Sequence, residues 1–179
     1  MKHVTLVTGG VRSGKSTHAL ELAQSYPKRV FIATATPFDS EMESRIAKHQ
    51  AERGLTFDTI EEPVHLAEAL CKVPQNTDVV LIDCLTIWAS NLLFRFGEDK
   101  DWFPQIDSLL DALSNPPCNV VLVTNEVGMG IVPESPLGRR FRDLAGSINQ
   151  HVARVATRVV FMVSGIPMQI KPQHGGAVC

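Results

Sequence analysis

The chain has 179 residues, of which 44% are hydrophobic and 20% charged. This is an ordinary globular composition, so disorder is excluded as the main state, and the length suits one domain with a substantial core. Seventeen Lys and Arg against nineteen Asp and Glu give a net charge of −2. No basic excess therefore points to a nucleic acid or to an anionic membrane as a partner.

The sequence also bears on location. No apolar run approaches the roughly 18–20 residues that a membrane span needs, and the first residues lead into a strand-like run without the cleavage region of a signal peptide. Cys71, Cys84, Cys118 and Cys179 are scattered and form no Cys-x-x-Cys pair. We therefore expect reduced thiols in a cytoplasmic protein, with neither a zinc site nor a disulfide framework.

Short apolar runs alternate with helical patterns along the chain. Continuous runs predict strands that are covered on both faces. The expected strands are 4–8, 29–34, 79–82, 120–123 and 159–163, with a weaker edge strand over 55–60. The run over 159–163 closes the expected series. This alternation predicts an α/β fold with a mostly parallel sheet flanked by helices, in one domain over 1–173 with a loose tail over 174–179.

Helix start signals occupy three places. A helical stretch over 17–26 follows the first strand. Ser40 followed by Glu43 is a capping box that predicts a helix running to about Arg53. Ser135 and Pro136 place an N-cap and a first-turn proline before a pattern of apolar residues at three- and four-residue spacing. That pattern predicts an amphipathic helix of about 20 residues.

A phosphate-binding pattern, G-x-x-x-x-G-K-[ST], stands between the first strand and the first helix. It consists of Gly9, Gly10, Val11, Arg12, Ser13, Gly14, Lys15 and Ser16. Backbone N–H groups of such a loop point at phosphate oxygens, and the helix N-terminus adds partial positive charge. We expect Lys15 to reach the β- and γ-phosphates and Ser16 to ligate Mg²⁺. The domain is thus predicted to be a P-loop NTPase of the RecA-like type.

Asp83 follows the apolar run 79–82, so its carboxylate is expected at the carboxyl end of a central strand. We interpret it as the second Mg²⁺ ligand; the alternative is an aspartate that merely ends a strand. The motifs of a GTPase switch are missing, because Asp83 leads into Cys84-Leu85-Thr86 and the run 120–123 leads into Thr124-Asn125-Glu126-Val127.

In the helix opened by Ser40, Arg45, His49 and Arg53 fall at i, i+4 and i+8 and share one face. Two guanidinium groups would attract phosphates and would lower the pKa of the imidazole, leaving a ring nitrogen free to attack phosphorus. The alternative is a surface histidine on a solvated, charged helix.

Eight segments, in order along nearly the whole chain, carry a specific resemblance. They are 8–16, 31–35, 45–49, 59–63, Asp83-Cys84-Leu85-Thr86-x-Trp88-x-x-Asn91, 124–133, Phe141-Arg142-Asp143-x-x-Gly146-x-x-Asn149-Gln150, and 164–167. On these residues the sequence resembles the bifunctional adenosylcobinamide kinase / adenosylcobinamide-phosphate guanylyltransferase family of cobalamin biosynthesis. The run Thr-Asn-Glu-Val-Gly-Met-Gly-Ile-Val-Pro over 124–133 is the most particular of them.

The resemblance implies two reactions. ATP or GTP phosphorylates the aminopropanol hydroxyl of adenosylcobinamide, and GMP from GTP is then transferred to that phosphate, giving adenosyl-GDP-cobinamide and pyrophosphate. It further implies that GMP is first held on a histidine, here His49. The small-molecule partners that it implies are adenosylcobinamide, GTP and ATP, and the oligomeric state that it implies is a homotrimer.

The same resemblance implies further nucleotide contacts. These are Thr34, Ala35, Thr36, Gln50, Ala51, Glu52, Arg53, Glu61 and Asp83. The alternative for Glu61 is an ordinary acid in the first turn of a helix. Asn125 and Glu126 are expected to face the same crevice, or else to cap a turn.

Two other functions remain open from the residues. A P-loop kinase for another small hydroxyl substrate would work without His49. A nucleotide-binding switch without catalytic role would respond to the γ-phosphate but would turn over very slowly. A RecA-type ATPase that depends on nucleic acid would need a basic stripe, against which the balanced charge argues.

Overall fold

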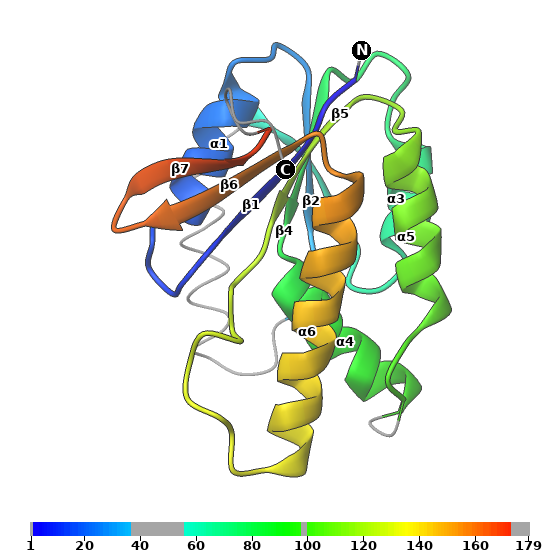
Figure 1. Cartoon of the computed structure of the whole chain (residues 1–179). Coiled ribbons are helices and arrows are strands. Elements are labelled where there is room, and N and C mark those ends of the chain that lie inside the picture. Colours follow the sequence, from blue (N-terminus) through cyan, green and yellow to red (C-terminus); the bar gives the residue numbers. More distant parts are fainter. Residues whose placement is uncertain (1, 37–55, 98–99, 173–179) are drawn as a thin grey trace.

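The structure is a computed structural model that describes residues 2–36, 56–97 and 100–172. Its centre is a seven-stranded sheet of order β3-β2-β4-β5-β1-β6-β7 (Figure 1). The strands are β1 (Val4–Gly9), β2 (Arg29–Ala33), β3 (Asp58–Glu61), β4 (Val79–Asp83), β5 (Asn119–Val123), β6 (Arg158–Val163) and β7 (Ile166–Lys171). All neighbouring pairs are parallel except β6 and β7. The predicted α/β class with a mostly parallel sheet is confirmed.

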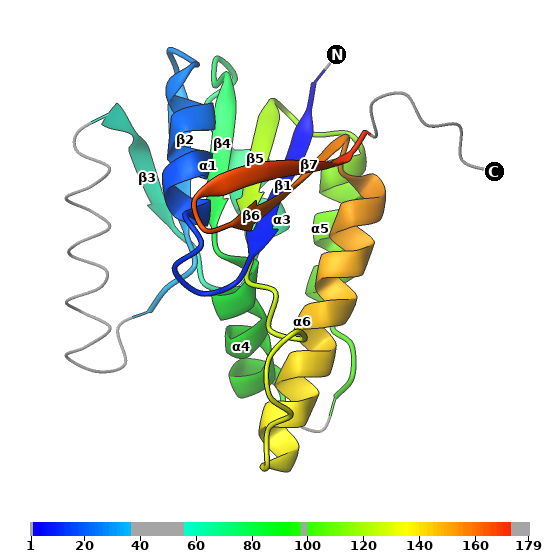
Figure 2. The same cartoon turned by 60° about the vertical axis from the view of Figure 1, so that its left-hand side comes forward.

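Helices cover both faces of the sheet (Figures 1 and 2). Helix α1 (Lys15–Gln24) packs on one face. The other face carries α3 (Leu66–Lys72), α4 (Leu85–Phe96), α5 (Pro104–Ser114) and α6 (Pro136–Val155). The predicted N-cap is confirmed, because the Ser135 hydroxyl accepts a hydrogen bond from the Gly138 N–H at 3.1 Å. The helix predicted over 40–53 lies outside the described residues.

The alternation of side chains along β1 shows how the two layers form. Val4 and Leu6 pack with α3 to α6, whereas Val7 packs with Ala19 and Ala23 of α1. All three β1 side chains are buried because helices lie on both sides of the strand. Trp88 of α4 is fully buried, and its indole N–H donates to the Val64 carbonyl at 2.7 Å. This satisfies the one polar group of the largest side chain in the core.

The prediction that 159–163 closes the series of strands is wrong. A two-residue turn, Ser164-Gly165, leads into β7, which pairs antiparallel with β6. Both turn residues have positive φ, 51° and 84°, as a type I′ hairpin requires. The available signal was a Ser-Gly pair between two runs of apolar residues. Pro167 weakens the strand pattern, but a proline is tolerated in an edge strand such as β7.

Two further expectations concern the C-terminal tail and membrane-spanning helices. The loose tail over 174–179 lies outside the described residues, so that domain boundary stays a prediction. Among the helices of the described ranges, none has the length and apolar character needed to cross a bilayer.

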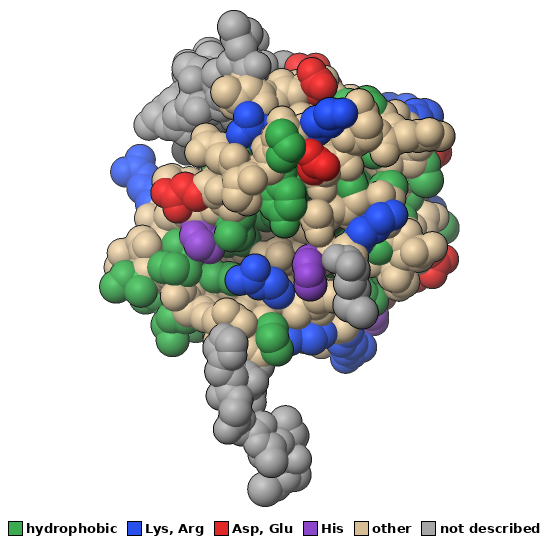
Figure 3. Space-filling view, turned by 90° about the horizontal axis from the view of Figure 1, so that it is seen from above, with side chains coloured by type: hydrophobic (Ala, Val, Ile, Leu, Met, Phe, Trp, Pro, Cys, Tyr) green, Lys and Arg blue, Asp and Glu red, His purple; other side chains and the backbone are tan. Residues whose placement is uncertain are grey.

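Basic and acidic side chains are interspersed on the face seen from above in Figure 3, at the amino ends of the central strands.

The register of the sheet places the ends of its central strands in one row. Ala33 of β2 pairs with Asp83 of β4, Asp83 pairs with Val123 of β5, and Val123 pairs with Val7 of β1. Because these strands are parallel, the segments after all four leave the sheet at one edge. The phosphate loop therefore emerges beside the residues that come after β5, β4 and β2.

Burial separates the cysteines in a way that thiol labelling can test. Burial is the main cause that raises the pKa of Cys84 to about 12 and that of Cys118 to about 11, whereas Cys71 is exposed. Since the thiolate is the reactive form, we expect iodoacetamide at pH 8 to alkylate Cys71 at least about 100-fold faster than Cys84. Peptide mass spectrometry over time measures this, with labelling in guanidinium chloride as the control. Equal rates for the two thiols in the folded protein would contradict the packing of β4 against α1.

Candidate active site

The phosphate loop depends on two glycines for its shape. Gly9 has a φ of 150°, and a Cβ there would lie 2.5 Å from the Met162 carbonyl oxygen. Gly14 has a φ of 91°, and a Cβ there would lie 3.2 Å from the Gly165 Cα. Any side chain would clash at Gly9, and L residues rarely adopt either backbone conformation. Only glycine lets the chain turn this tightly from β1 into α1.

The β6–β7 turn braces this loop from the side. The Gly165 N–H donates to the Ser13 carbonyl at 3.0 Å, and the Gly14 backbone lies against the same turn. Within the loop, the Ser13 N–H donates to the Gly10 carbonyl at 3.3 Å. The hairpin that the sequence patterns did not predict is therefore a structural support of the phosphate loop.

Lys15 begins α1 and directs its ammonium into the loop. Its Nζ donates to the Gly10 carbonyl and approaches the Ser13 hydroxyl at 3.4 Å. Only 7% of the residue is exposed, and this burial lowers the pKa of Lys15, while Cys84 and Asp83 act in the opposite direction. A poorly solvated ammonium surrounded by backbone dipoles is suited to bind phosphate oxygens, because it gives up little hydration when they arrive.

Asp83 is the last residue of β4 and is partly exposed. Its charge is close enough to oppose the lowering of the Lys15 pKa, so the two groups share one site. The peptide bond between Asp83 and Cys84 is cis. Within the described ranges no three His, Cys, Asp or Glu side chains cluster to form a metal site.

The segment after β2 is held at the same edge. Thr34 is fully buried, and its hydroxyl accepts from the Cys84 N–H at 2.7 Å and donates to the Cys84 carbonyl at 2.9 Å. Ala35 and Thr36 are partly exposed. The hydroxyl of Thr34 therefore anchors β2 to β4, and Ala35 and Thr36 are the members of this segment that solvent reaches. A nucleotide contact for these three residues stays a prediction.

Glu61 lies at the far end of the row. It ends β3, where it pairs with Ala33, and its side chain is exposed. The alternative of a first-turn helix acid does not hold for it, because α3 begins at Leu66. Glu62 instead accepts from the Val64 and His65 N–H groups, at 2.9 and 2.8 Å, just before that helix. Since β3 is four strands from β1, Glu61 lies roughly 19 Å along the sheet from the phosphate loop.

Asn125 and Glu126 come after β5 at this edge, as expected. The Glu126 N–H donates to the Gly9 carbonyl at 3.0 Å, which ties the segment to the start of the phosphate loop. Both residues are partly exposed. The other predicted residues, His49, Gln50, Ala51, Glu52 and Arg53, together with Arg45, lie outside the described residues, so the role of His49 stays a prediction.

Sequence reasoning assigned no role to three buried polar residues behind the site. Thr86, Thr124 and Asn149 are at most 8% exposed and bond to one another and to the Asn125 backbone. A signal was present, because Thr124 comes directly after four apolar residues and Asn149 stands between Ile148 and Val152 on the buried side of α6.

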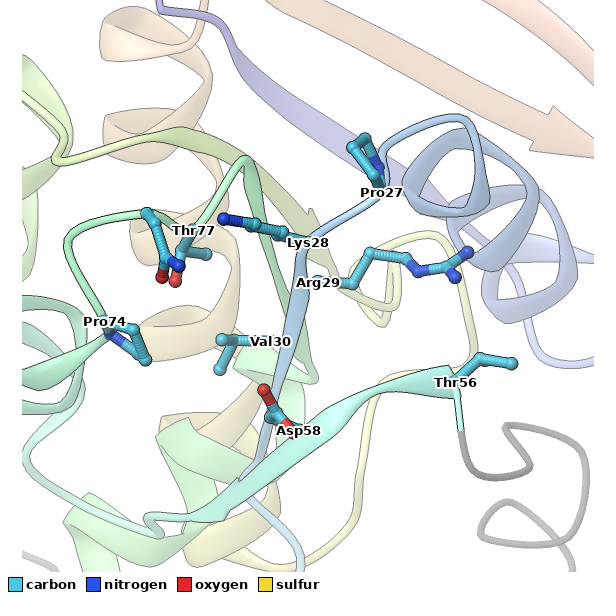
Figure 4. A pocket seen from close by; sticks show the side chains of 9 residues that line it. Pro27, Lys28, Arg29, Val30, Thr56, Asp58, Pro74 and Thr77 are labelled. Atoms are coloured by element: carbon cyan, nitrogen blue, oxygen red, sulfur yellow. The ribbon is translucent and has the colours of Figure 1, made fainter.

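A hollow of about 310 Å³ lies elsewhere, at the amino ends of β2 and β3 (Figure 4). Its basic side chains are Lys28 and Arg29. The Arg29 guanidinium turns toward α1, where it donates to the Gln24 carbonyl at 3.2 Å and lies over the Phe57 ring. This hollow is at the opposite end of the sheet from Lys15, so we do not assign it to the site.

Comparison with known sequences identifies relatives along nearly the full length. Residues 5–170 match the model of the family described as cobinamide kinase / cobinamide phosphate guanyltransferase. The chain is 46% identical to the bifunctional adenosylcobalamin biosynthesis protein CobU of Escherichia coli, covering 93% of this chain and 98% of that protein. It is 41% identical to the bifunctional adenosylcobalamin biosynthesis protein CobP of Pseudomonas aeruginosa, covering 93% and 96%.

Solved structures extend the likeness in fold alone. An ATPase from the type III secretion system of pathogenic bacteria aligns with a TM-score of 0.55 at 11% identity, over 93% of this chain and 56% of the other. A protein from Pyrococcus horikoshii aligns with a TM-score of 0.56 at 9% identity, over 95% and 88%. The predicted single-domain P-loop architecture is confirmed.

The two first glycines of the loop provide a matched pair for testing its geometry. We expect Gly9→Ala to lower the free energy of unfolding by about 1–3 kcal/mol, because the added Cβ overlaps the Met162 carbonyl. Gly10→Ala meets nothing within 4 Å and should change it by less than about 0.5 kcal/mol. Urea unfolding of both variants measures the difference. Equal stabilities of the two variants would contradict the close approach of β1 to β6 at Gly9.

Proposed function

The chain belongs to the cobinamide kinase / cobinamide phosphate guanyltransferase family, and we propose how its site performs the two reactions. It is an adenosylcobinamide kinase that uses ATP or GTP, and an adenosylcobinamide-phosphate guanylyltransferase that uses GTP. The observation that carries this assignment into the structure is the buried Lys15 inside the phosphate loop, with Asp83 beside it. No finding favours a kinase for another hydroxyl substrate or a switch without catalytic role.

In the kinase step, the chain positions the two reactants and stabilises the charge that develops between them. The hydroxyl oxygen of adenosylcobinamide forms a bond to the γ-phosphorus while the bond to the β–γ bridging oxygen breaks, and the hydroxyl proton passes to water. The N–H groups of the loop and Lys15 hold the phosphates and stabilise the charge that develops on the leaving diphosphate. We assign Ser16 and Asp83 to Mg²⁺, which would neutralise the phosphate oxygens when bound.

In the guanylyl step, a histidine nitrogen forms a bond to the α-phosphorus of GTP while the bond to the α–β bridging oxygen breaks and pyrophosphate leaves. A phosphate oxygen of adenosylcobinamide phosphate then forms a bond to that phosphorus while the phosphorus–nitrogen bond breaks, which frees the histidine. We propose His49 as the nucleophile that carries GMP, because it matches the family motif and shares a helical face with Arg45 and Arg53 in the predicted helix. A covalent intermediate divides one difficult displacement into two easier ones. Lys15 would stabilise the departing pyrophosphate as it stabilises the diphosphate in the first step.

We further propose that Ala35, Thr36 and Glu61 contact the nucleotide away from its phosphates. Their support is position, since they lie at the carboxyl ends of β2 and β3, at the same edge of the sheet. By resemblance to the family, we propose a homotrimer in the cytoplasm. Light scattering coupled to size-exclusion chromatography measures the oligomeric state.

Replacing Lys15 tests whether one phosphate loop serves both reactions. We expect Lys15→Ala to reduce kcat/KM at least about 100-fold in both steps, because each loses the same buried cation. Lys28→Ala removes an equal charge at the opposite end of the sheet and should leave both reactions unchanged. Steady-state assays with each nucleotide measure this. Full kinase activity in Lys15→Ala would refute the assignment of the loop.

Replacing His49 separates the two reactions. We expect His49→Ala to lose guanylyl transfer by more than about 10³-fold while kinase activity stays within about threefold, since phosphoryl transfer needs no covalent group on the protein. Wild-type protein incubated with Mg²⁺ and GTP labelled at the α-phosphorus should carry acid-labile, base-stable label on a peptide that contains His49. Label on His49→Ala would identify a different nucleophile, and transfer by this variant at the wild-type rate would refute the role of His49.

A further inference from the structure

Three side chains and one backbone unit form a closed ring of hydrogen bonds behind the phosphate loop. The Asn125 N–H donates to the Thr86 hydroxyl at 2.7 Å, and the Thr86 and Thr124 hydroxyls lie 3.2 Å apart. The Thr124 hydroxyl donates to the Asn149 Oδ1 at 2.7 Å, and the Asn149 Nδ2 donates to the Asn125 carbonyl at 3.1 Å. The ring therefore begins and ends on the backbone of Asn125.

The direction of every bond in the ring is determined. Thr124 gives its one hydroxyl proton to Asn149, so between the two threonines Thr86 is the donor and Thr124 the acceptor. Thr86 in turn accepts from Asn125. Each hydroxyl thus donates once and accepts once around the ring. Removing the hydroxyl of Thr124 breaks two bonds together.

The three side chains of the ring are buried, so water has little access to the two bonds that join them to one another. Thr124 is 1% exposed, Thr86 7% and Asn149 8%. The three residues come from β5's carboxyl end, the first turn of α4 and the middle of α6. A fully satisfied buried network rigidifies the segment to which it is bonded. Here that segment is the backbone of Asn125.

The ring and the phosphate loop hold the same short segment from two sides. The Thr124 N–H donates to the Val7 carbonyl at 3.0 Å, and the Glu126 N–H donates to the Gly9 carbonyl at 3.0 Å. Both bonds join the segment to β1, whereas both backbone polar groups of the residue between, Asn125, are bonded by the ring. The ring therefore sets where Asn125 and Glu126 stand relative to the phosphate loop.

The position of residues 124–126 in the sheet indicates their role in the site. β5 lies between β1, which leads into the phosphate loop, and β4, which ends at Asp83. The segment after β5 thus lies between the cation that holds the phosphates and the carboxylate that we assign to Mg²⁺. In the proposed kinase step, this is where the γ-phosphate would meet its acceptor.

We propose that Thr86, Thr124 and Asn149 are positioning residues for phosphoryl transfer. They hold Asn125 and Glu126 at the place where the acceptor hydroxyl meets the γ-phosphate, and they do not contact either group. The inference rests on the proposed kinase function and adds to it the device that orients the acceptor side of the site. Misplacement by about 1 Å costs on the order of 100-fold in rate, which is the scale of effect expected from opening the ring.

Thr124→Val opens the ring without changing the shape of the side chain, and Thr124→Ser keeps the hydroxyl. We expect Thr124→Val to lower the kinase kcat about 10- to 100-fold, while the Kd for ATP stays within about twofold of the wild-type value. Thr124→Ser should restore most of kcat. Thr157→Val is the control for the same substitution away from the site, because the Thr157 hydroxyl bonds to the Val4 backbone at the amino end of β1. It should keep the wild-type kcat.

The outcomes separate positioning from folding and from the proposed function. A wild-type kcat in Thr124→Val overturns the inference, and so does a parallel loss of kcat and ATP affinity, which would indicate general loosening. If Thr124→Val does not fold, Thr86→Val and Thr86→Ser carry the same test, because Thr86 supplies the ring's other hydroxyl. Failure of the wild-type protein to phosphorylate adenosylcobinamide would instead overturn the proposed function.

Discussion

The site depends on one constraint, the parallel register of β2, β4, β5 and β1. Because the four strands run in the same direction and pair in register, their carboxyl ends lie in one row. The phosphate loop, the residues after β5 and Asp83 then emerge side by side. Apolar strands that are covered on both faces keep this register, since a slip would move the core residues of one face onto the other.

The site also requires a cation that is poorly solvated and still hydrogen-bonded. Lys15 meets it because the loop's backbone carbonyl and the Ser13 hydroxyl accept from its ammonium. The loop keeps that shape because Gly9 and Gly14 adopt conformations that other residues rarely adopt, and because Gly165 supports it from the β6–β7 turn. A hairpin at the edge of the sheet thus contributes to phosphate chemistry at its centre.

The fold and the function of this protein are supported by different comparisons. Solved structures at 9% and 11% identity share its architecture, and a P-loop sheet of this kind serves proteins as different as a secretion ATPase. The family is instead shown by sequence relatives at 41–46% identity over nearly the whole chain. The likeness that shows the family therefore extends well beyond the generic loop, over residues 5–170.

The sequence by itself determined six of the seven strands, the long helix after Ser135 and the phosphate loop, because apolar runs, caps and the G-x-x-x-x-G-K-[ST] pattern are local signals. It determined β1, β4 and β5 almost to the residue, and the Ser135 cap. It did not determine β7, since Pro167 and the exposed side chains of that strand obscure its pattern, nor the ring of Thr86, Thr124 and Asn149. Those three residues are far apart in the chain, and only the packing of α4 and α6 on the end of β5 brings their polar groups together. Burial then decides that these groups must bond to one another, which no local spacing can express.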